Sequence, residues 1–339
     1  MRSYYRKLAR LAKSSSVMIS EFGFQLFLKT AISELRKNKL QVFAPIIDHN
    51  EPKISDEAAY LQWLNTHAIT PANRIAMQNE LTSFLTHPTF HVQIAVDDRN
   101  KAFLKDTLDS LADQVYDRFD FSIKGITSQL ENSEEINSNL QDMVSSKLKD
   151  RYVKNTDPLK GNADFTVFLQ AGSVLTPDSL YRIAQFLNKN QDADIIYSDE
   201  DYMTELRQRS HPFFKPSWSP DLFLNMDYIS NFFAVRSSLL YLHKISEQYG
   251  SAQFYELLLR VSEKSGKIFH IPTILVSIRL DQGFASADDF KENALRAIKD
   301  CLERRKTKAA VSVSNLATWI PTFRVRYSLD SNHSRKGMR

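Results

Sequence analysis

The 339-residue chain has one cysteine, Cys301, and only eight glycines. A single cysteine excludes an internal disulfide and any Cys-x-x-Cys metal knuckle. Because a free thiol usually packs as a small hydrophobic group, we expect Cys301 to be buried on a helix in a reducing cytoplasm. The few glycines form no phosphate-cradling loop. No apolar run approaches the ~18 residues of a membrane span, and the basic N-terminus lacks the apolar core of an export signal.

Positive charge is concentrated at the N-terminus. Residues 1–40 contain nine Lys or Arg and two Glu, a net +7, whereas the whole chain is +4, so the remainder carries −3. This imbalance indicates an anionic partner, and we expect a membrane surface rather than nucleic acid. In 22–40, apolar residues recur at helical spacing between cations, which fits a helix at a lipid interface or one packed on its own domain. We predict that 1–45 is the membrane-facing segment.

Strand-like and helix-like segments alternate along most of the chain. Strands are predicted over 91–96, 119–126, 163–170, 193–199, 231–240 and 267–280, and helices over 103–115, 133–149, 177–190, 252–265 and 286–305. Thr176 and Pro177 fit the start of the third helix. The alternation predicts an α/β fold with a mixed, mainly parallel sheet flanked by helices. We expect a basic helical extension over 1–85, the α/β domain over 86–328 and a disordered tail over 329–339.

The segment HPFFKPSWSPDLFLNMDYISNFFAVRSSLL (211–240), with IIYSDED upstream, resembles the central part of family 2 glycosyltransferases of bacterial surface-polysaccharide pathways. That family's pattern runs approximately YSDED, P-x-FKPDWSPDLLL and N-Y-I-x-H-L-x-V-x-R-x-S-L. YLQWLNTH (60–67) is similar to the Tyr-x-x-Trp element before the catalytic domain. FRVRYSL (323–329) resembles the segment where tandem members begin a second transferase domain. The resemblance covers roughly 55–328 and implies a GT-A fold, which binds nucleotide-sugars.

The resemblance implies a hexosyl- or rhamnosyltransferase-like enzyme, with a nucleotide-sugar donor and a glycan or lipid-linked acceptor. An active member holds Mg²⁺ or Mn²⁺ through an acidic DxD, because these cations prefer oxygen ligands. Here that stretch reads FLQAGSVLTP, with Gln170 and Gly172 in the acidic positions. Phe254 takes the position of the catalytic base, and Ser277 that of the imidazole in a Tyr-His-Trp-Arg element. We therefore expect a degenerate donor site, with no cofactor and no metal held by the protein.

Three other residues are candidates on the donor side, and one is a candidate for catalysis. Asp97 and Asp98 follow the first strand and could contact the nucleotide or form a solvated turn. Glu256 could replace the missing base or remain an exposed helical acid. Arg279 on the last strand could meet the diphosphate or form a salt bridge.

The resemblance places Asp199, Glu200 and Asp201, which end an apolar strand, on the acceptor side, together with Trp218. The acids could hold an acceptor, or they could cap a turn or pair with Arg207 or Arg209. A metal site made by the triplet alone is disfavoured because the supporting imidazole is missing. Trp218 could stack on a sugar or pin its proline-rich loop to the core. We expect these acids to organise a loop.

Two functions fit this sequence. The first is a divergent, inverting GT-A transferase that acts on a lipid-linked or surface glycan. The second is a non-catalytic GT-A-like binding or scaffold subunit that partners an active glycosyltransferase. For both we expect a cytoplasmic protein, peripheral at the inner membrane face. Donor binding that is strengthened by metal would favour the transferase over the non-catalytic subunit.

Overall fold

The computed structural model describes residues 56–125, 143–153, 162–204, 206–279, 287–314 and 320–328. The chain divides into two units, Met1–Ala59 and Tyr60–Arg339, and only residues 56–59 of the first are described. The predicted basic segment 1–45 and the tail 329–339 lie outside the described residues, as does most of the helix predicted over 133–149. The account below concerns the second unit.

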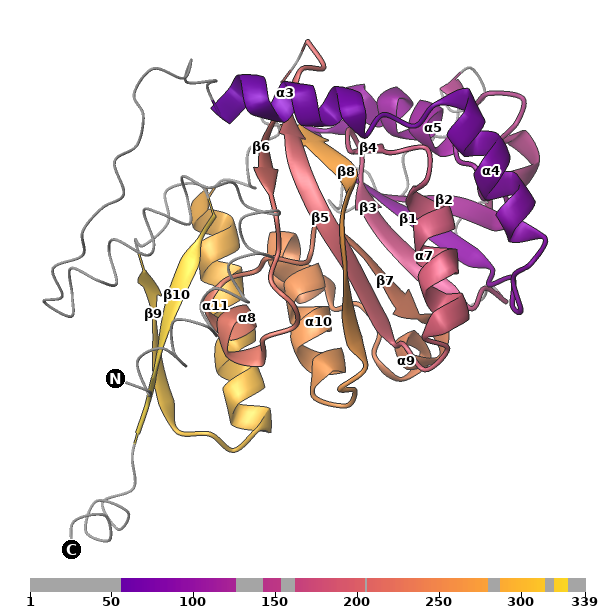
Figure 1. Cartoon of the computed structure of the whole chain (residues 1–339). Helices are drawn as coiled ribbons and strands as arrows, with labels where there is room; N and C mark the ends of the chain where they lie inside the picture. Colours follow the sequence, from indigo (N-terminus) through magenta and orange to yellow (C-terminus); the bar gives the residue numbers. More distant parts are fainter. Residues whose placement is uncertain are drawn as a thin grey trace, which may run out of the picture. The chain divides into compact units, whose positions relative to one another are not determined.

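A mixed sheet forms the centre of this unit (Figure 1). Five strands run in one direction: β1 (Phe90–Val96), β2 (Phe119–Gly125), β3 (Phe165–Gln170), β5 (Ile195–Met203) and β8 (Ile268–Arg279). β7 (Phe232–Arg236) lies antiparallel between β3 and β5, and the short β4 (Val174–Leu175) and β6 (Arg209–Phe213) are also antiparallel to their neighbours. The order is β2-β1-β3-β7-β5-β8-β4, with β6 on β5. The predicted mixed, mainly parallel sheet is confirmed.

Helices cover both faces of the sheet and create two cores. The described helices are α3 (Asp56–Thr66), α4 (Pro71–Leu81), α5 (Leu104–Ala112), α7 (Ser179–Lys189), α8 (Pro220–Asn225), α9 (Ser237–Leu242), α10 (Gln253–Ser262) and α11 (Ala287–Arg304), with 3-10 turns η1 (Lys101–Phe103), η2 (Lys149–Arg151) and η3 (Glu247–Ala252). Alternation along β3 sends Val167 and Leu169 to the core under α5 and α7, and Phe168 to the core under α8, α10 and α11. Cys301 is buried on α11 in the second core, as predicted, and burial raises the pKa of its thiol to about 12.

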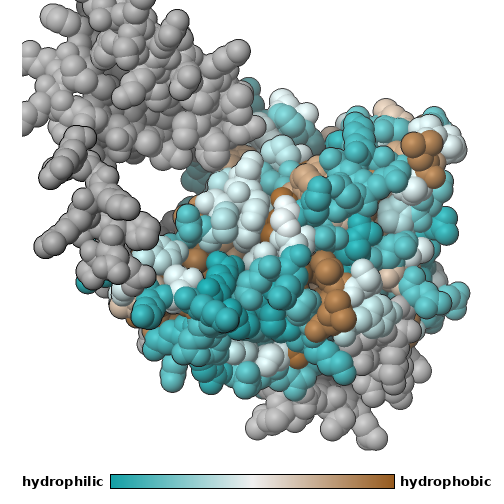
Figure 2. Space-filling model, turned by 90° about the horizontal axis from the view of Figure 1, so that it is seen from below, coloured by the Kyte–Doolittle hydropathy of each residue, from teal (hydrophilic) through white to brown (hydrophobic). Residues whose placement is uncertain are grey.

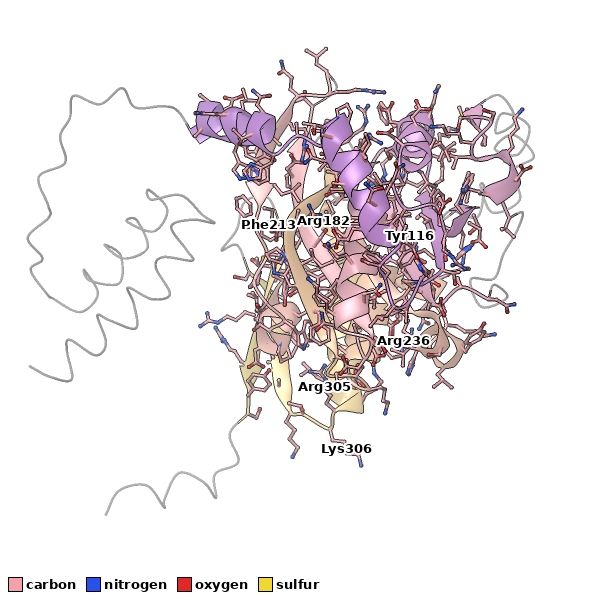
Figure 3. The ribbon with its side chains drawn as sticks, turned by 45° about the vertical axis from the view of Figure 1, so that its right-hand side comes forward. Tyr116, Arg182, Phe213, Arg236, Arg305 and Lys306 are labelled. Carbon is pink, nitrogen blue, oxygen red and sulfur yellow. The ribbon has the colours of Figure 1, made fainter. Side chains whose placement is uncertain are left out.

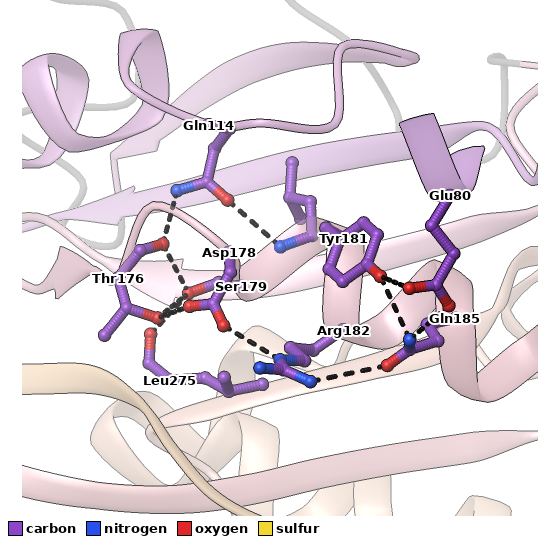
Figure 4. Close-up of polar contacts among 10 residues, drawn as sticks. Glu80, Gln114, Thr176, Asp178, Ser179, Tyr181, Arg182, Gln185 and Leu275 are labelled. Carbon is purple, nitrogen blue, oxygen red and sulfur yellow. Dashed lines mark hydrogen bonds and ion pairs between the residues drawn. The ribbon is translucent and has the colours of Figure 1, made fainter. Parts of the chain in front are cut away.

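Two predicted boundaries were wrong. The strand predicted over 231–240 ends at Arg236, and α9 follows at once. A short apolar run does not distinguish strand from buried helix by periodicity alone. The helix predicted to be capped by Thr176 begins at Ser179, with Asp178 at the N-cap position. The Thr176 hydroxyl instead donates to the Asp178 carboxylate at 2.8 Å (Figure 4).

A separate antiparallel hairpin follows α11. β9 (Ala309–Ser314) pairs with β10 (Thr322–Tyr327), and Met226, just after α8, bridges to Thr322. Figure 3 shows Arg305 and Lys306, which lead from α11 into β9, at the lower end of the unit, below Phe213 of β6. The bridge from Met226 to Thr322 ties the segment between α8 and β7 to the hairpin.

The surface seen from below is mostly hydrophilic, with a small apolar patch (Figure 2). Among the described residues, no helix has the length and hydropathy needed to cross a membrane.

Candidate functional site

The turn after β3 occupies the position of the expected acidic motif. Gly172 has φ = 86°, in the left-handed region that glycine adopts without a Cβ penalty. The Thr107 hydroxyl of α5 accepts a hydrogen bond from the Gly172 amide at 2.8 Å and donates to the Ser173 carbonyl at 2.8 Å. The Thr107 side chain therefore holds the backbone of the turn against α5, and the turn carries no charge. The Ser173 hydroxyl is buried and has no hydrogen-bond partner among the described residues.

A divalent metal does not fit the residues at this turn. Gln170, Gly172 and Ser173 supply no carboxylate. On β8, Ser277 stands opposite Val174 in the position where an imidazole was expected. Across the described ranges, no three His, Cys, Asp or Glu side chains gather closely enough to hold a metal ion. Mg²⁺ and Mn²⁺ need oxygen ligands, and usually carboxylates, so the donor set is unsuitable.

Two arginines share one carboxylate beside this turn. Asp106, next to Thr107 on α5, forms ion pairs with Arg279 at the end of β8 and with Arg207. The Arg279 side chain is 4% exposed and its guanidinium lies 4.1 Å from the centre of the Phe103 ring, whereas Arg207 is 62% exposed. Two guanidinium groups on one carboxylate leave a net charge of +1. Sequence reasoning gave Arg279 as either a diphosphate contact or a salt bridge; the salt bridge is present. It missed Asp106, because nothing local links two residues so far apart.

The expected base position is filled by an aromatic cluster. Phe254 is 5% exposed, and its ring centre lies 5.2 Å from that of Phe168 and 5.9 Å from that of Phe233. Glu256 is 2% exposed and accepts hydrogen bonds from Arg260 at 2.9 and 2.7 Å. The alternative that Glu256 is an exposed helical acid was therefore wrong. Its pairing with Arg260 also leaves it poorly suited to take a substrate proton.

Two acids of the 199–201 triplet organise the segment before α8. Asp199 accepts from the Lys215 backbone amide at 2.8 Å and contacts His270 Nε2 at 2.7 Å. Glu200 pairs with Lys215 Nζ at 2.9 Å and accepts from the Asn231 side-chain Nδ2 at 2.8 Å. The Lys215 and Glu200 side chains are 0% and 1% exposed, so this ion pair is fully buried. The expectation that the triplet organises a loop agrees with these contacts.

Asp201 joins three elements. Its Oδ2 accepts from Arg209 Nε of β6 at 2.7 Å and from the Tyr60 hydroxyl of α3. Burial raises the pKa of Asp201, while Arg209, Ser277 and Tyr60 oppose that rise. The predicted pairing with Arg209 is confirmed, whereas Arg207 pairs with Asp106 instead.

The remaining predicted residues have local roles. Asp97 Oδ1 accepts from the amides of Arg99 and Asn100 at 2.9 and 3.0 Å and so closes the turn after β1. Asp98 is half exposed and lies 3.5 Å from the Lys101 ammonium. The Trp218 ring packs 5.3 Å from that of Phe223, which attaches the proline-rich loop to the core.

The chain resembles a protein of O-antigen synthesis. No protein-family model matches it. The sequence is 28% identical over 275 residues to O-antigen biosynthesis protein RfbC of Myxococcus xanthus, covering 77% of this chain and 21% of RfbC. This similarity covers most of this chain but only part of RfbC.

The other matches are shorter or lower in identity. It is 32% identical over 153 residues to the uncharacterized protein y4gI of Sinorhizobium fredii, covering 43% of this chain and 17% of that protein. The chain thus spans about a fifth of the length of the curated relatives it matches. S. aureus TarS 1-349 in complex with UDP-GlcNAc is 14% identical, with a TM-score of 0.47 over 63% of this chain and 66% of that one. The mannosyltransferase PcManGT from Pyrobaculum calidifontis, in complex with GDP-Man and Mn²⁺, is 11% identical, with a TM-score of 0.46 over 73% and 76%.

Proposed function

We propose that this chain binds a nucleoside diphosphate-sugar and transfers the sugar to a glycan or lipid-linked acceptor in surface-polysaccharide biosynthesis. The observation that carries the proposal is the pair of arginines on Asp106, beside the turn that follows β3. In open α/β sheets ligands bind outside the carboxyl ends of the strands, which is where this cluster lies. The similarity to RfbC supports the pathway. The non-catalytic scaffold role is not the function we propose.

The arginines supply the charge that a metal supplies in other transferases. A guanidinium presents planar N–H donors that match phosphate oxygens in pairs. The neutral turn at Gln170–Ser173 brings no negative charge toward the diphosphate. Bound diphosphate would compete with Asp106 for Arg207, whose exposed side chain can reorient without disturbing the core. Donor binding by this site therefore needs no divalent cation.

Arg207→Gln should weaken donor binding by about tenfold, because one charge-assisted contact with phosphate contributes roughly 1.4 kcal/mol or more. Calorimetry with a panel of nucleoside diphosphate-sugars that includes UDP-GlcNAc and GDP-mannose measures the affinity, with EDTA and with Mn²⁺. We expect the same affinity in both conditions. Lys105→Gln is the matched control, because Lys105 is on the same helix as Asp106 but pairs with Asp109.

Two outcomes contradict this prediction. Binding that is lost in EDTA returns a metal to the site and refutes the arginine role. If no panel member binds at all, the proposed function itself fails.

We also propose that the basic segment 1–45 adsorbs to an anionic membrane, which would place the protein at the cytoplasmic face of the inner membrane. Each cation near an anionic leaflet contributes ~1 kcal/mol, so half of the nine would give measurable adsorption. Sedimentation with vesicles should show binding to phosphatidylserine-containing but not to neutral vesicles. The binding should fall with added salt and disappear when 1–45 is deleted. Equal binding to both kinds of vesicle contradicts the electrostatic mechanism.

A further inference from the structure

Lys124 stands at the same edge of the sheet as the turn after β3. Ala95 on β1 lies opposite Lys124 on β2 and opposite Gln170 on β3, so the three residues form a row across neighbouring strands. The Ala171 amide donates to the Ala95 carbonyl at 2.9 Å, which joins the turn to β1. Neighbouring strands are about 4.8 Å apart, so the backbone of Lys124 lies about 10 Å from that of Gln170. The row therefore borders the turn on the side of β2 (Figure 1).

The side chains of this row point toward the start of α10. Alternation along β3 puts Gln170 on the same face as Phe168, whose ring centre lies 5.2 Å from that of Phe254 on α10. Residues that stand opposite one another on paired strands share a face, so Lys124 points to this side as well. Its Nζ lies 2.7 Å from Oε1 of Glu247 on η3, the turn that leads directly into α10. The end of β2 is thus joined to η3 by an ion pair.

The strand order favours a ligand at this row. In the order β2-β1-β3, the chain leaves β1 for β2 on one side, while β3 lies on the other side. In open α/β sheets ligands bind outside the carboxyl ends of the strands where the order reverses, which here is between β1 and β3. In dinucleotide-binding folds an acid near the end of the second strand accepts a hydrogen bond from the ribose. Here the last side chain of β2 is Lys124, and the carboxylate beside it belongs to Glu247.

This ion pair is suited to hydroxyl groups. The Glu247 side chain is 59% exposed and the Lys124 side chain 31%, so a ligand can reach both. A carboxylate accepts several hydrogen bonds and an ammonium donates three, so the pair offers acceptor and donor atoms side by side without net charge. Vicinal ribose hydroxyls need both kinds of partner. A carboxylate alone would repel the diphosphate of the same ligand, and the Lys124 ammonium cancels that repulsion.

We propose that Glu247 binds the ribose hydroxyls of the nucleotide-sugar donor, and that Lys124 positions its carboxylate. The turn after β3 then lies between the ribose and the arginines on Asp106, because Thr107, next to Asp106, bonds to the other side of that turn. A carboxylate from η3 thus serves the end of β2, where the strand itself carries a cation. The assignment rests on the proposed function and gives the site a preference for ribonucleotides.

Glu247→Ala tests the assignment, with UDP, GDP and their 2′,3′-dideoxy counterparts as probes in calorimetry. The wild type should bind at least one ribonucleotide roughly tenfold more tightly than its dideoxy form, because the dideoxy form loses the bonds to a charged carboxylate. In Glu247→Ala the two affinities should become equal. Removing the charge affects both forms alike, so the ratio of the two affinities is the readout. A merely structural role for Glu247 would change both affinities and leave their ratio unaltered.

Asp192→Ala is the matched control, because Asp192 is equally exposed and pairs with Lys267 at 2.6 Å, just before β5 and β8 begin. It should keep the wild-type ratio. Both variants remove one partner of an exposed ion pair, so the Tm of each should stay close to that of the wild type.

Two results overturn the assignment and leave donor binding intact. The first is a wild type that binds each ribonucleotide and its dideoxy form with equal affinity, a comparison that needs no variant. The second is a Glu247→Ala variant that keeps the tenfold preference. A wild type that binds neither these nucleotides nor their sugar conjugates refutes the proposed function and, with it, this assignment.

Discussion

Lys215→Met should lower the free energy of unfolding by about 3–5 kcal/mol, the range expected when one partner of a buried ion pair is removed. The Lys215 and Glu200 side chains are 0% and 1% exposed, so Glu200 would be left charged in the core. The bond from Asn231 remains, but an amide contributes no compensating charge. Urea unfolding monitored by circular dichroism measures the loss.

The double variant Lys215→Met/Glu200→Gln separates charge from packing. If the uncompensated carboxylate causes the loss, removing that charge should recover most of the stability. Lys105→Met is the matched surface control, because Lys105 is 57% exposed in a pair with Asp109. It should change the stability by less than about 0.5 kcal/mol. A loss below about 1 kcal/mol for Lys215→Met contradicts the buried pair.

Phe254→Asp should unfold much of the population instead of restoring a transferase base. Loss of a buried phenylalanine ring costs about 3–5 kcal/mol, and an unpaired carboxylate among aromatic rings adds to that cost. Phe254 contacts Phe168 and Phe233 at the centre of the second core. Thermal unfolding followed by circular dichroism gives the shift in Tm, and a nucleoside diphosphate release assay gives the activity.

Phe254→Leu controls for the loss of the ring alone. It should cost about 1–2 kcal/mol, because a leucine fills much of the same volume without adding a charge. A Phe254→Asp variant that is as stable as Phe254→Leu would show that this position is open to solvent. Higher activity in Phe254→Asp would return the base to α10.

The parts of the fold that follow from local periodicity could be predicted from the sequence. β3 illustrates this, because successive side chains of Phe165–Gln170 enter opposite cores. The boundaries were less predictable. The hydroxyl of Thr176 looks like a helix cap in the sequence, but in the fold it binds Asp178. The helix instead begins at Ser179, whose hydroxyl donates to the Leu275 carbonyl of β8 at 2.6 Å.

The candidate site was predictable only where a family motif fixes the position of a residue. The absence of acids at Gln170 and Gly172 could be read directly from the sequence. The ion pair of Asp106 with Arg279 could not be predicted, because it joins α5 to β8, which are far apart in the sequence.

The conformation of Gly172 has a consequence for the substitutions that this turn tolerates. At φ = 86° an aspartate would carry a strain of about 1 kcal/mol. That substitution would lower stability and would still create no metal site, because Gln170 and Ser277 remain neutral. An aspartate in place of Phe254 would be costlier. Each single step toward an acidic, metal-binding site therefore costs stability before any benefit appears.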